Sequence, residues 1–140
     1  MDSKSITDLK SATWYSFSRS NEEELMKVIS HLPGVYVIRR NEHFDRLVGI
    51  TDIVYIGRAT TGKGKRKGLH RRIRGYLHTT PRRRTSYRVM YWTEKLGGFE
   101  IAFIICNTDD EAIEKEIFLL RNFEKEHAEL PPFNRQGDKI

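Results

Sequence analysis

Two β-rich runs separated by a short, mostly polar segment constrain the fold of this chain more than any other feature. The first run covers Gly34–Arg39 and the second covers Ile50–Gly57, with the predicted connection 41–46 between them. Successive runs of this kind predict a β-hairpin. The chain has 140 residues, which is enough for one domain with a modest core built on that hairpin.

A helical pattern precedes the hairpin. Ser20-Asn21 is predicted to cap this helix, and Pro33-Gly34 is predicted to stop the pattern. The apolar stripe of the helix is expected to consist of Leu25, Val28, Ile29 and Leu32. Residues 1–33 are therefore expected to form an N-terminal helical extension.

The rest of the chain is predicted to add further helices and one strand. Leu69–His78 is predicted to be a helix, Phe99–Cys106 a mostly apolar strand, and the segment up to about His127 a long helix capped by Asp109 or Asp110. Ser86–Leu96 fits either a helix or a strand. This order predicts an α+β fold with a small, largely antiparallel three-stranded sheet flanked by helices over residues 34–140.

Composition excludes several classes of protein. No apolar run approaches the roughly 18 residues of a membrane helix, and no apolar signal segment follows the first residues. The one cysteine, Cys106, cannot form an internal disulfide or a cysteine-only metal site, and its apolar surroundings predict a small buried residue. The cytoplasm is therefore the expected location.

Positive charge is concentrated in one segment. The net charge is +6, yet from Ile53 to Thr93 there is no Asp or Glu at all. Such a block either lies solvated at the surface or faces a polyanion, most commonly nucleic-acid phosphate, and its length favours the polyanion. Its basic residues are Arg58, Lys63, Lys65, Arg66, Lys67, Arg71, Arg72, Arg74, Arg82, Arg83, Arg84 and Arg88.

Two charged side chains lie on or beside the apolar faces of predicted helices, the faces that should pack against the core. Arg72 flanks the apolar face of its helix, four residues before Tyr76, so the two side chains can touch. An arginine there can also extend past apolar surface to solvent. Glu116 falls near the middle of a broad apolar arc, where a carboxylate without a partner is costly. Three explanations stay open for Glu116: a buried salt bridge, a position at the rim of a cleft, or a metal ligand.

With the hairpin, these residues resemble the GIY-YIG nuclease superfamily. Gly34-Val35-Tyr36 is similar to its first signature element, and Val54-Tyr55-Ile56-Gly57 is similar to the second. Leu69–Tyr76 looks like the arginine helix of the N-terminal nuclease domain in bacterial nucleotide-excision repair. The helix through Glu116 lies where the family has its metal-binding glutamate, and Phe133-Asn134 matches the aromatic–asparagine element. These elements cover residues 34–135 in the family's order.

The resemblance implies a metal-dependent DNA endonuclease that hydrolyses phosphodiester bonds. Tyr36 and Tyr55 would line the active site, one of them orienting or deprotonating the attacking water, and Arg72 would contact the scissile phosphate. Tyr76 stands where many members carry histidine and some carry tyrosine. Nearby arginines and a metal ion are expected to lower the tyrosine pKa, which makes a role as base accessible.

The resemblance also implies a cofactor and a partner. Glu116 would hold one divalent ion, Mg²⁺ or Mn²⁺, and Asn134 would steady the site through hydrogen bonds. The partner would be duplex or branched DNA, and cutting both strands would require a homodimer or sequential nicks. The residues expected to bind phosphate are Arg58, Lys63, Lys65, Arg66, Lys67, Arg71 and Arg74.

The chain departs from the compact family pattern between its second element and its arginine helix. The segment 60–68 is an apparent insertion, predicted either to grip the DNA backbone or to lie solvated as a surface loop. The main alternative to an endonuclease is a nucleic-acid-binding module of the same fold that does no chemistry. A third reading, a structural protein whose basic face meets an acidic protein, requires the order of the motifs to be coincidence.

Overall fold

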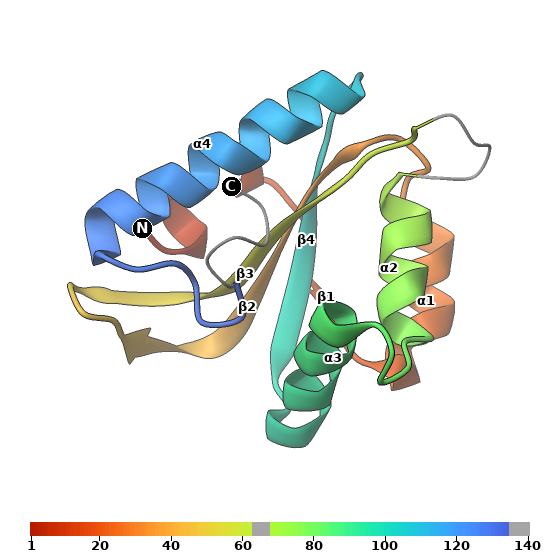
Figure 1. The fold of residues 1–140 in the computed structure, drawn as a ribbon, viewed down its shortest axis with the longest axis horizontal. Helices are drawn as coiled ribbons and strands as arrows, with labels where there is room; N and C mark the ends of the chain where they lie inside the picture. The colour runs from red at the N-terminus through yellow and green to blue at the C-terminus, as the bar shows by residue number, and fades with distance from the viewer. Residues whose placement is uncertain (63–67, 135–140) are drawn as a thin grey trace.

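The structure of the protein is a computed structural model, and it describes residues 1–62 and 68–134. Within these residues it is an α+β fold with a four-stranded antiparallel sheet and four α-helices (Figure 1). The sheet has the order β1-β4-β2-β3. Its strands are β1 (Tyr15–Ser16), β2 (Gly34–Asp45), β3 (Ile50–Ala59) and β4 (Phe99–Ile105). The helices are α1 (Glu22–Val28), α2 (Leu69–Leu77), α3 (Arg84–Leu96) and α4 (Asp109–His127).

The predicted hairpin is confirmed. β2 pairs with β3, and Tyr36 lies opposite Gly57 in the register. β2 is longer than expected because it continues through the predicted connection as far as Asp45, with irregular register on both sides of Arg39. On its other side β2 pairs with β4, which is therefore an interior strand, as its apolar sequence indicates.

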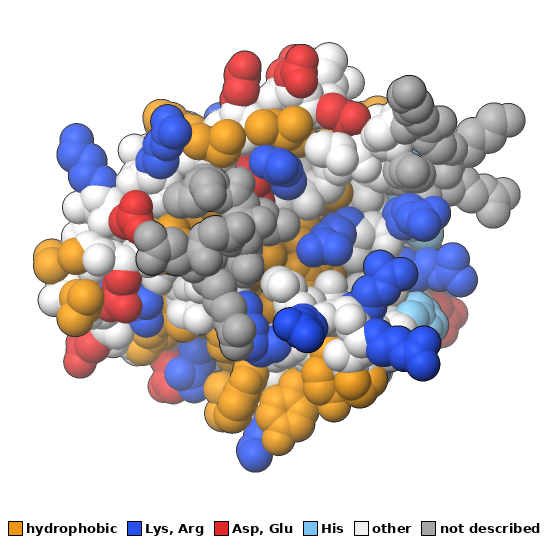
Figure 2. Space-filling model, in the orientation of Figure 1, with side chains coloured by type: hydrophobic (Ala, Val, Ile, Leu, Met, Phe, Trp, Pro, Cys, Tyr) orange, Lys and Arg blue, Asp and Glu red, His pale blue; other side chains and the backbone are white. Residues whose placement is uncertain are grey.

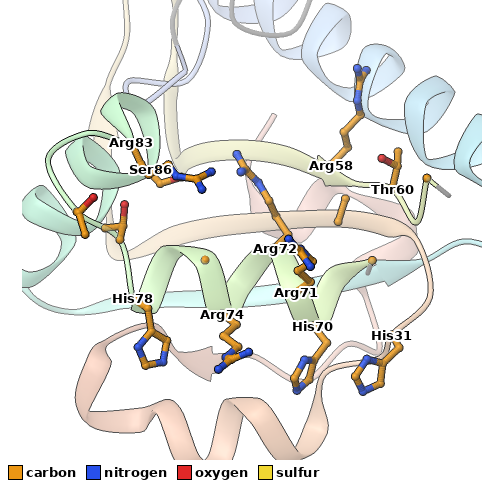
Figure 3. Close-up of a pocket in the computed structure, with 16 residues that line it drawn as sticks. His31, Arg58, Thr60, His70, Arg71, Arg72, Arg74, His78, Arg83 and Ser86 are labelled. Carbon is orange, nitrogen blue, oxygen red and sulfur yellow. The ribbon is translucent and has the colours of Figure 1, made fainter. Parts of the chain in front are cut away.

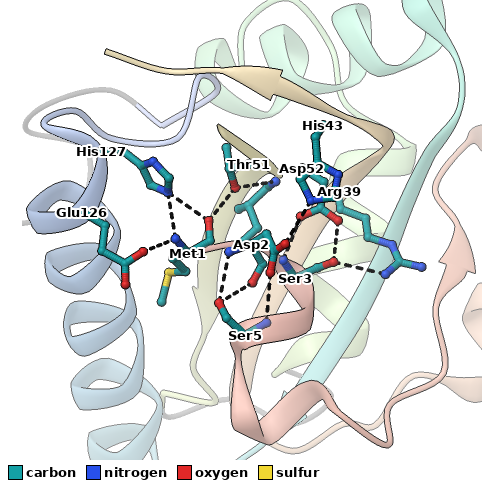
Figure 4. A network of polar contacts seen from close by, with 11 residues as sticks. Met1, Asp2, Ser3, Ser5, Arg39, His43, Thr51, Asp52, Glu126 and His127 are labelled. Carbon is teal, nitrogen blue, oxygen red and sulfur yellow. Dashed lines mark hydrogen bonds and ion pairs between the residues drawn. The ribbon is translucent and has the colours of Figure 1, made fainter. Parts of the chain in front are cut away.

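Residues 1–33 do not form the helical extension expected from the sequence. β1 adds a fourth strand to the predicted three, because Tyr15 pairs with Ile101 of β4. A strand of two residues is too short to leave a pattern in the sequence. Figure 4 shows the first residues bonded to the sheet: Ser3 donates to the Asp52 carboxylate through its backbone N and its Oγ, at 2.7 and 2.5 Å. The segment is thus attached to the sheet rather than set apart from it.

The first helix is shorter than predicted because the chain leaves it to cap the next helix. α1 ends at Val28, so two of the predicted stripe residues, Val28 and Leu32, are exposed. The carbonyl oxygens of Ser30 and Leu32 accept hydrogen bonds from the backbone N–H groups of His70 and Leu69, at 2.9 and 3.0 Å. The first N–H groups of a helix have no partner inside it. The segment before β2 therefore fixes where α2 begins.

Helices cover both faces of the sheet. α1, α2 and α3 pack on one face around a core that includes Tyr36 and Ile73, while α4 packs on the other face through Leu120 and Phe123. The ambiguous segment Ser86–Leu96 is helical and belongs to α3. No helix in the part of the chain that the structure describes is long and apolar enough to cross a membrane.

The N-terminus of α4 differs from the prediction in its capping residue. Thr108 is the N-cap, and its side chain accepts a hydrogen bond from the Glu111 N–H at 3.1 Å. Thr108 has the extended backbone that this position requires, whereas Asp109 is already inside the helix. Asp109 instead accepts hydrogen bonds from the backbone N–H groups of Thr61 and Gly62, at 2.7 and 3.0 Å. Asp109 therefore bonds the segment that follows β3 to the start of α4.

Candidate active site

Three tyrosines from separate elements meet between the sheet and α2. Tyr36 comes from β2, Tyr55 from β3 and Tyr76 from α2, and all three are completely buried. The hydroxyl oxygens of Tyr36 and Tyr76 lie 2.8 Å apart, at hydrogen-bond distance. The rings of Tyr36 and Tyr55 are stacked with centroids 5.9 Å apart, and Tyr76 packs edge-on against both. The fold thus brings together three of the predicted site residues.

Gly57 makes room for this cluster. It faces Tyr36 across the hairpin, and a Cβ atom at this position would lie 2.4 Å from Cζ of Tyr36 and 2.7 Å from Cε2 of Tyr55. Contacts that short are not tolerated between side chains. Gly57 is therefore needed for the close approach of the tyrosine rings rather than for an unusual backbone angle.

Arg72 reaches the tyrosine cluster from α2. Its Nε donates to the Tyr36 hydroxyl at 3.2 Å, and its Nη2 donates to the Tyr76 hydroxyl at 3.4 Å. The guanidinium carbon also lies 4.9 Å from the centroid of the Tyr76 ring. The predicted contact between Arg72 and Tyr76 is confirmed. Figure 3 shows the Arg72 side chain extending between Arg58 and Arg83, away from Arg74 and the histidines on the other side of α2.

Burial keeps the clustered tyrosines neutral. It raises the pKa of Tyr36 well above its usual value, and the Tyr76 oxygen adds to this, while Arg72 opposes it. Burial likewise raises the pKa of Tyr55 and of Tyr76. Arg72 acts to lower the pKa of each tyrosine, as expected of a nearby arginine, but desolvation of the hydroxyl outweighs its charge, so the net shift is upward. The oxygen of Tyr36 in turn raises the pKa of Arg72, which stays charged.

Glu116 enters the site from α4 and meets Arg58 of β3. Its side chain is completely buried, and its Oε1 accepts a hydrogen bond from Arg58 Nη1 at 3.2 Å. Among the three explanations for Glu116, a buried salt bridge is therefore present. Arg58 is 31% exposed and was predicted as a phosphate ligand rather than as a partner of Glu116. The Glu116 charge lies close enough to Tyr55 to be one of the influences that raise its pKa, after burial and Tyr36.

The Glu116 carboxylate suits a hard divalent cation as a single ligand. Among residues 1–62 and 68–134 there is no group of three His, Cys, Asp or Glu side chains that could hold a metal ion. These residues therefore contain no side-chain cluster of the kind that forms a closed zinc site. Magnesium often takes only one or two carboxylates and completes its shell with water and phosphate oxygens. One buried carboxylate next to a basic cleft is compatible with that pattern.

Asn134 acts on the backbone of the strand that carries Tyr55. Its Oδ1 accepts a hydrogen bond from the Ile56 N–H at 3.0 Å, and its Nδ2 donates to the Ile56 carbonyl oxygen at 2.9 Å. Its side chain is buried. Asn134 therefore fixes the backbone of β3 between Tyr55 and Gly57. Both of these hydrogen bonds go to the backbone of Ile56, not to a tyrosine hydroxyl.

A basic cleft of about 1470 Å³ opens over α2 beside this cluster. Its volume exceeds the roughly 300–1,000 Å³ of small-molecule sites, and none of its described lining residues is Asp or Glu. Figure 2 shows Lys and Arg side chains gathered over this part of the surface. Arginines that line it are Arg58, Arg71, Arg72, Arg74 and Arg83. The predicted phosphate ligands Lys63, Lys65, Arg66 and Lys67, and with them the predicted role of the insertion, lie outside the described residues.

The cleft also contains residues that the sequence did not single out. His31 and His70 stack with ring centroids 4.2 Å apart at its margin. Burial, followed by the neighbouring His31, lowers the pKa of His70. Ser86 of α3 lines the cleft as well. Isolated histidines and a serine in an ambiguous segment give no signal in a single sequence, because only the packing of α2 against its neighbours brings them together.

Comparisons with known proteins concern the fold. No protein-family model and no curated protein matches this sequence. The structure is similar to the GIY-YIG N-terminal endonuclease domain of UvrC from Thermotoga maritima, solved bound to its catalytic divalent cation, magnesium. That domain is 23% identical, with a TM-score of 0.48, over 82% of this chain and 97% of the domain. A point mutant of the domain is 22% identical, with a TM-score of 0.47, over 83% and 97% of the two chains. Both matched structures are GIY-YIG endonuclease domains, and at this identity the likeness concerns the fold alone.

Proposed function

We propose that this protein is a metal-dependent DNA endonuclease that hydrolyses phosphodiester bonds. The proposal is carried by one observation: Arg72 is hydrogen-bonded to the Tyr36 and Tyr76 hydroxyls next to the Arg58–Glu116 pair, at a cleft without acidic lining residues. Hydrolysis of a phosphodiester requires an oriented water and stabilisation of charge on the phosphoryl oxygens. These side chains are suited to both tasks.

Arg72 would bind the scissile phosphate. A guanidinium has five N–H donors, so hydrogen bonds to two tyrosines leave donors for phosphate oxygens. The raised pKa of Arg72 keeps it charged at any working pH. Its contacts with Tyr36 and Tyr76 restrict its orientation before DNA arrives, which lowers the cost of forming the transition state.

The tyrosines would orient water rather than deprotonate it. The pKa values of Tyr36, Tyr55 and Tyr76 are all raised by burial, so each hydroxyl is neutral near pH 7. A neutral hydroxyl can donate one hydrogen bond and accept others, which suits the positioning of a nucleophile. Of the two roles that the family resemblance implies for a tyrosine, orientation is the one that the protein supports by itself.

Glu116 would hold one Mg²⁺ or Mn²⁺ ion, and Arg58 would respond to the substrate. When bound, the ion supplies charge that stabilises the leaving oxygen. Arg58 fixes the Glu116 carboxylate through its 3.2 Å contact, while its partial exposure lets the guanidinium turn toward a phosphate in the cleft. Asn134 would keep β3, and with it Tyr55, in register with this pair.

The cleft would bind duplex or branched DNA through its phosphates. Arg71 and Arg74 are exposed and line the cleft on α2, where they can meet the backbone without entering the tyrosine cluster. Each phosphate contact made by such a residue makes binding more sensitive to salt. Cutting both strands would require a homodimer or two sequential nicks.

Nicking of supercoiled plasmid in Mg²⁺ or Mn²⁺ tests this proposal. The wild-type protein is expected to nick in the presence of either metal and to be inactive after chelation with EDTA. Arg72→Ala and Glu116→Gln are expected to bind DNA and to lose nicking. If the wild type fails to cut duplex, tailed and branched DNA under both metals, the endonuclease proposal is wrong.

The second candidate is a nucleic-acid-binding module that does no chemistry. The Arg58–Glu116 pair favours it, because a buried carboxylate held by an arginine can serve the fold alone. This candidate predicts salt-sensitive DNA binding with no metal-dependent cutting. It also predicts that Glu116→Gln has no effect beyond folding stability.

A further inference from the structure

We propose that the exposed aromatic face of α3, formed by Tyr87, Tyr91 and Trp92, binds unpaired nucleotides of the DNA that enters the cleft. This inference rests on the proposed function and narrows its substrate to DNA with a single-stranded or unstacked segment beside the cut. Figure 2 shows apolar side chains gathered at the lower edge of the molecule, where Figure 1 places α3, next to the Lys and Arg side chains of the cleft.

The rings of this aromatic face lie at the surface and contact one another. Tyr91 is 44% exposed and Trp92 is 40% exposed, while Tyr87 is partly buried. The Tyr87 and Tyr91 centroids are 6.3 Å apart, and Trp92 lies edge-on to Tyr91 at 5.1 Å. The rings support each other and present apolar area that the core of the domain does not use. Such rigid aromatic surface is costly to expose unless it binds something.

Helical spacing connects the aromatic face to the basic cleft. Residues seven apart lie almost on one line along a helix, so Arg84 and Tyr91 share a face of α3, and Lys95 continues it one turn later. Lys95 Nζ lies 5.5 and 5.6 Å from the ring centroids of Tyr91 and Trp92. At the other end, Arg83 immediately before α3 lines the cleft. A strand leaving the cleft would therefore meet an arginine first and the rings next.

The charged residues near the rings favour nucleic acid as the ligand of this face. α3 contains Arg84, Arg88 and Lys95 but only one acidic residue, Glu94. The Glu94 carboxylate already accepts a hydrogen bond from the backbone N–H of Arg19 at 2.8 Å. Basic residues that follow a backbone, with aromatic rings on which bases stack, are the elements by which proteins bind single strands. Paired bases cannot offer their faces, so the contact favours unpaired nucleotides.

Binding measured in EDTA separates this contact from catalysis. The probes are a labelled oligothymidylate, a blunt duplex, and the same duplex with an oligothymidylate tail, followed by fluorescence anisotropy at fixed salt. The Tyr91→Ala/Trp92→Ala variant is expected to lose at least about tenfold in affinity for the single strand and for the tailed duplex. Its affinity for the blunt duplex is expected to change less than about threefold, because phosphate contacts in the cleft remain.

Phe118→Ala is the matched control. Phe118 is 58% exposed on α4, on the opposite face of the sheet, and its ring centroid lies 5.9 Å from Nζ of Lys115, a lysine that is paired with Asp8. It is expected to bind all three probes as the wild type does. The conservative variant Trp92→Phe keeps a stacking ring and is expected to retain most of the affinity for the single strand. Thermal unfolding of each variant separates loss of binding from loss of the fold.

A second measurement reports on stacking directly. The chain has two tryptophans, so the Trp14→Phe variant leaves Trp92 as the sole one. Oligothymidylate is expected to quench its fluorescence in a saturable way that matches the anisotropy curve. Unchanged fluorescence at saturation, or equal binding of tailed duplex by wild type and Tyr91→Ala/Trp92→Ala, overturns the inference while leaving an active endonuclease intact. If instead the wild-type protein shows no metal-dependent cutting of any substrate, the proposed function is rejected.

Discussion

The Nε of Arg72 donates to the hydroxyl of Tyr36 at 3.2 Å, which joins the helix of the candidate site to the first strand of its hairpin. The same hydroxyl lies 2.8 Å from that of Tyr76, one turn along α2 from Arg72. Arg72 is thus held by two neutral oxygens that cannot neutralise its charge. A guanidinium placed in this way is oriented but still attracts an anion.

Removal of Arg72 should abolish most of the cutting and little of the binding. Arg72→Ala is expected to reduce the rate of plasmid nicking by at least about 10²–10³, the usual cost of a leading electrostatic contact in the transition state. Arg71→Ala, at the exposed neighbouring position, should weaken DNA binding and lower its salt dependence while nicking at saturating protein stays within about tenfold. Equal effects of the two substitutions on the saturated rate would contradict the assigned roles.

Glu116 should be required for metal dependence. Glu116→Gln keeps the shape of the side chain but removes the charge that would bind Mg²⁺ or Mn²⁺, so nicking should fall by at least about 10²–10³. Glu114→Gln, at an exposed position on α4, is the control and should cut normally with an unchanged metal titration. The idea fails if Glu116→Gln keeps the wild-type response to metal concentration.

Gly57 should tolerate no side chain. In Gly57→Ala the new methyl would lie 2.4 Å from Tyr36 Cζ, so we expect a loss of about 1–3 kcal/mol in the free energy of unfolding, as for an overpacked core. Gly75→Ala is the opposite case, because its Cβ position has no atom within 4 Å apart from its chain neighbours and the backbone of its own helix, and alanine favours a helix. It should gain about 0.5–1 kcal/mol. Chemical denaturation of both variants gives the comparison, and a neutral Gly57→Ala would contradict the packing described.

His70 should make the fold less stable in mild acid. Burial and His31 lower its pKa in the folded protein, so the unfolded chain binds the proton more readily. Stability should therefore rise with pH up to about 6.5, the ordinary histidine value, and this contribution should be constant above it. Denaturant midpoints measured against pH should show a smaller slope in that window for His70→Gln. His43→Gln, which alters a histidine that contacts Asp2, should keep the wild-type contribution from His70.

Bound DNA should reverse that effect. A phosphate near His70 favours the protonated ring, so the affinity for duplex should increase as the pH falls below about 6.5. Anisotropy titrations of wild type and His70→Gln at several pH values, at constant ionic strength, would measure this. The same pH dependence in both proteins would place the linked proton elsewhere.

The hairpin and the helix of Arg72 could be predicted because each carries a local pattern of sufficient length. α2 buries Leu69, Ile73 and Tyr76, the face that its spacing indicates. α1 could not be bounded in the same way, since its helix-forming pattern continues past Val28 while the chain is drawn away to bond with α2. Propensity was overridden there by a tertiary contact that a single sequence does not reveal.

The candidate site, too, could be predicted from the sequence only in part. The burial of Glu116 was predictable from the apolar arc around it, but its pairing with Arg58 was not, because the two residues lie on different elements. The sign of the tyrosine pKa shift was also beyond the sequence. It depends on how completely the hydroxyls are buried, and a count of nearby arginines suggests the opposite direction.

The hydrogen bonds of the last described residues have a consequence for solubility. β3 is the terminal strand of the sheet, and the N–H of Phe133 bonds to the Val54 carbonyl while Asn134 satisfies both backbone groups of Ile56. An open strand edge pairs readily with the edge of another molecule. Phe133 and Asn134 therefore cover this part of the β3 edge, and this cover should limit edge-to-edge pairing between molecules. If Asn134→Ala precipitates, the cause would be the uncovered edge of β3. This cause would be independent of any role of Asn134 in catalysis.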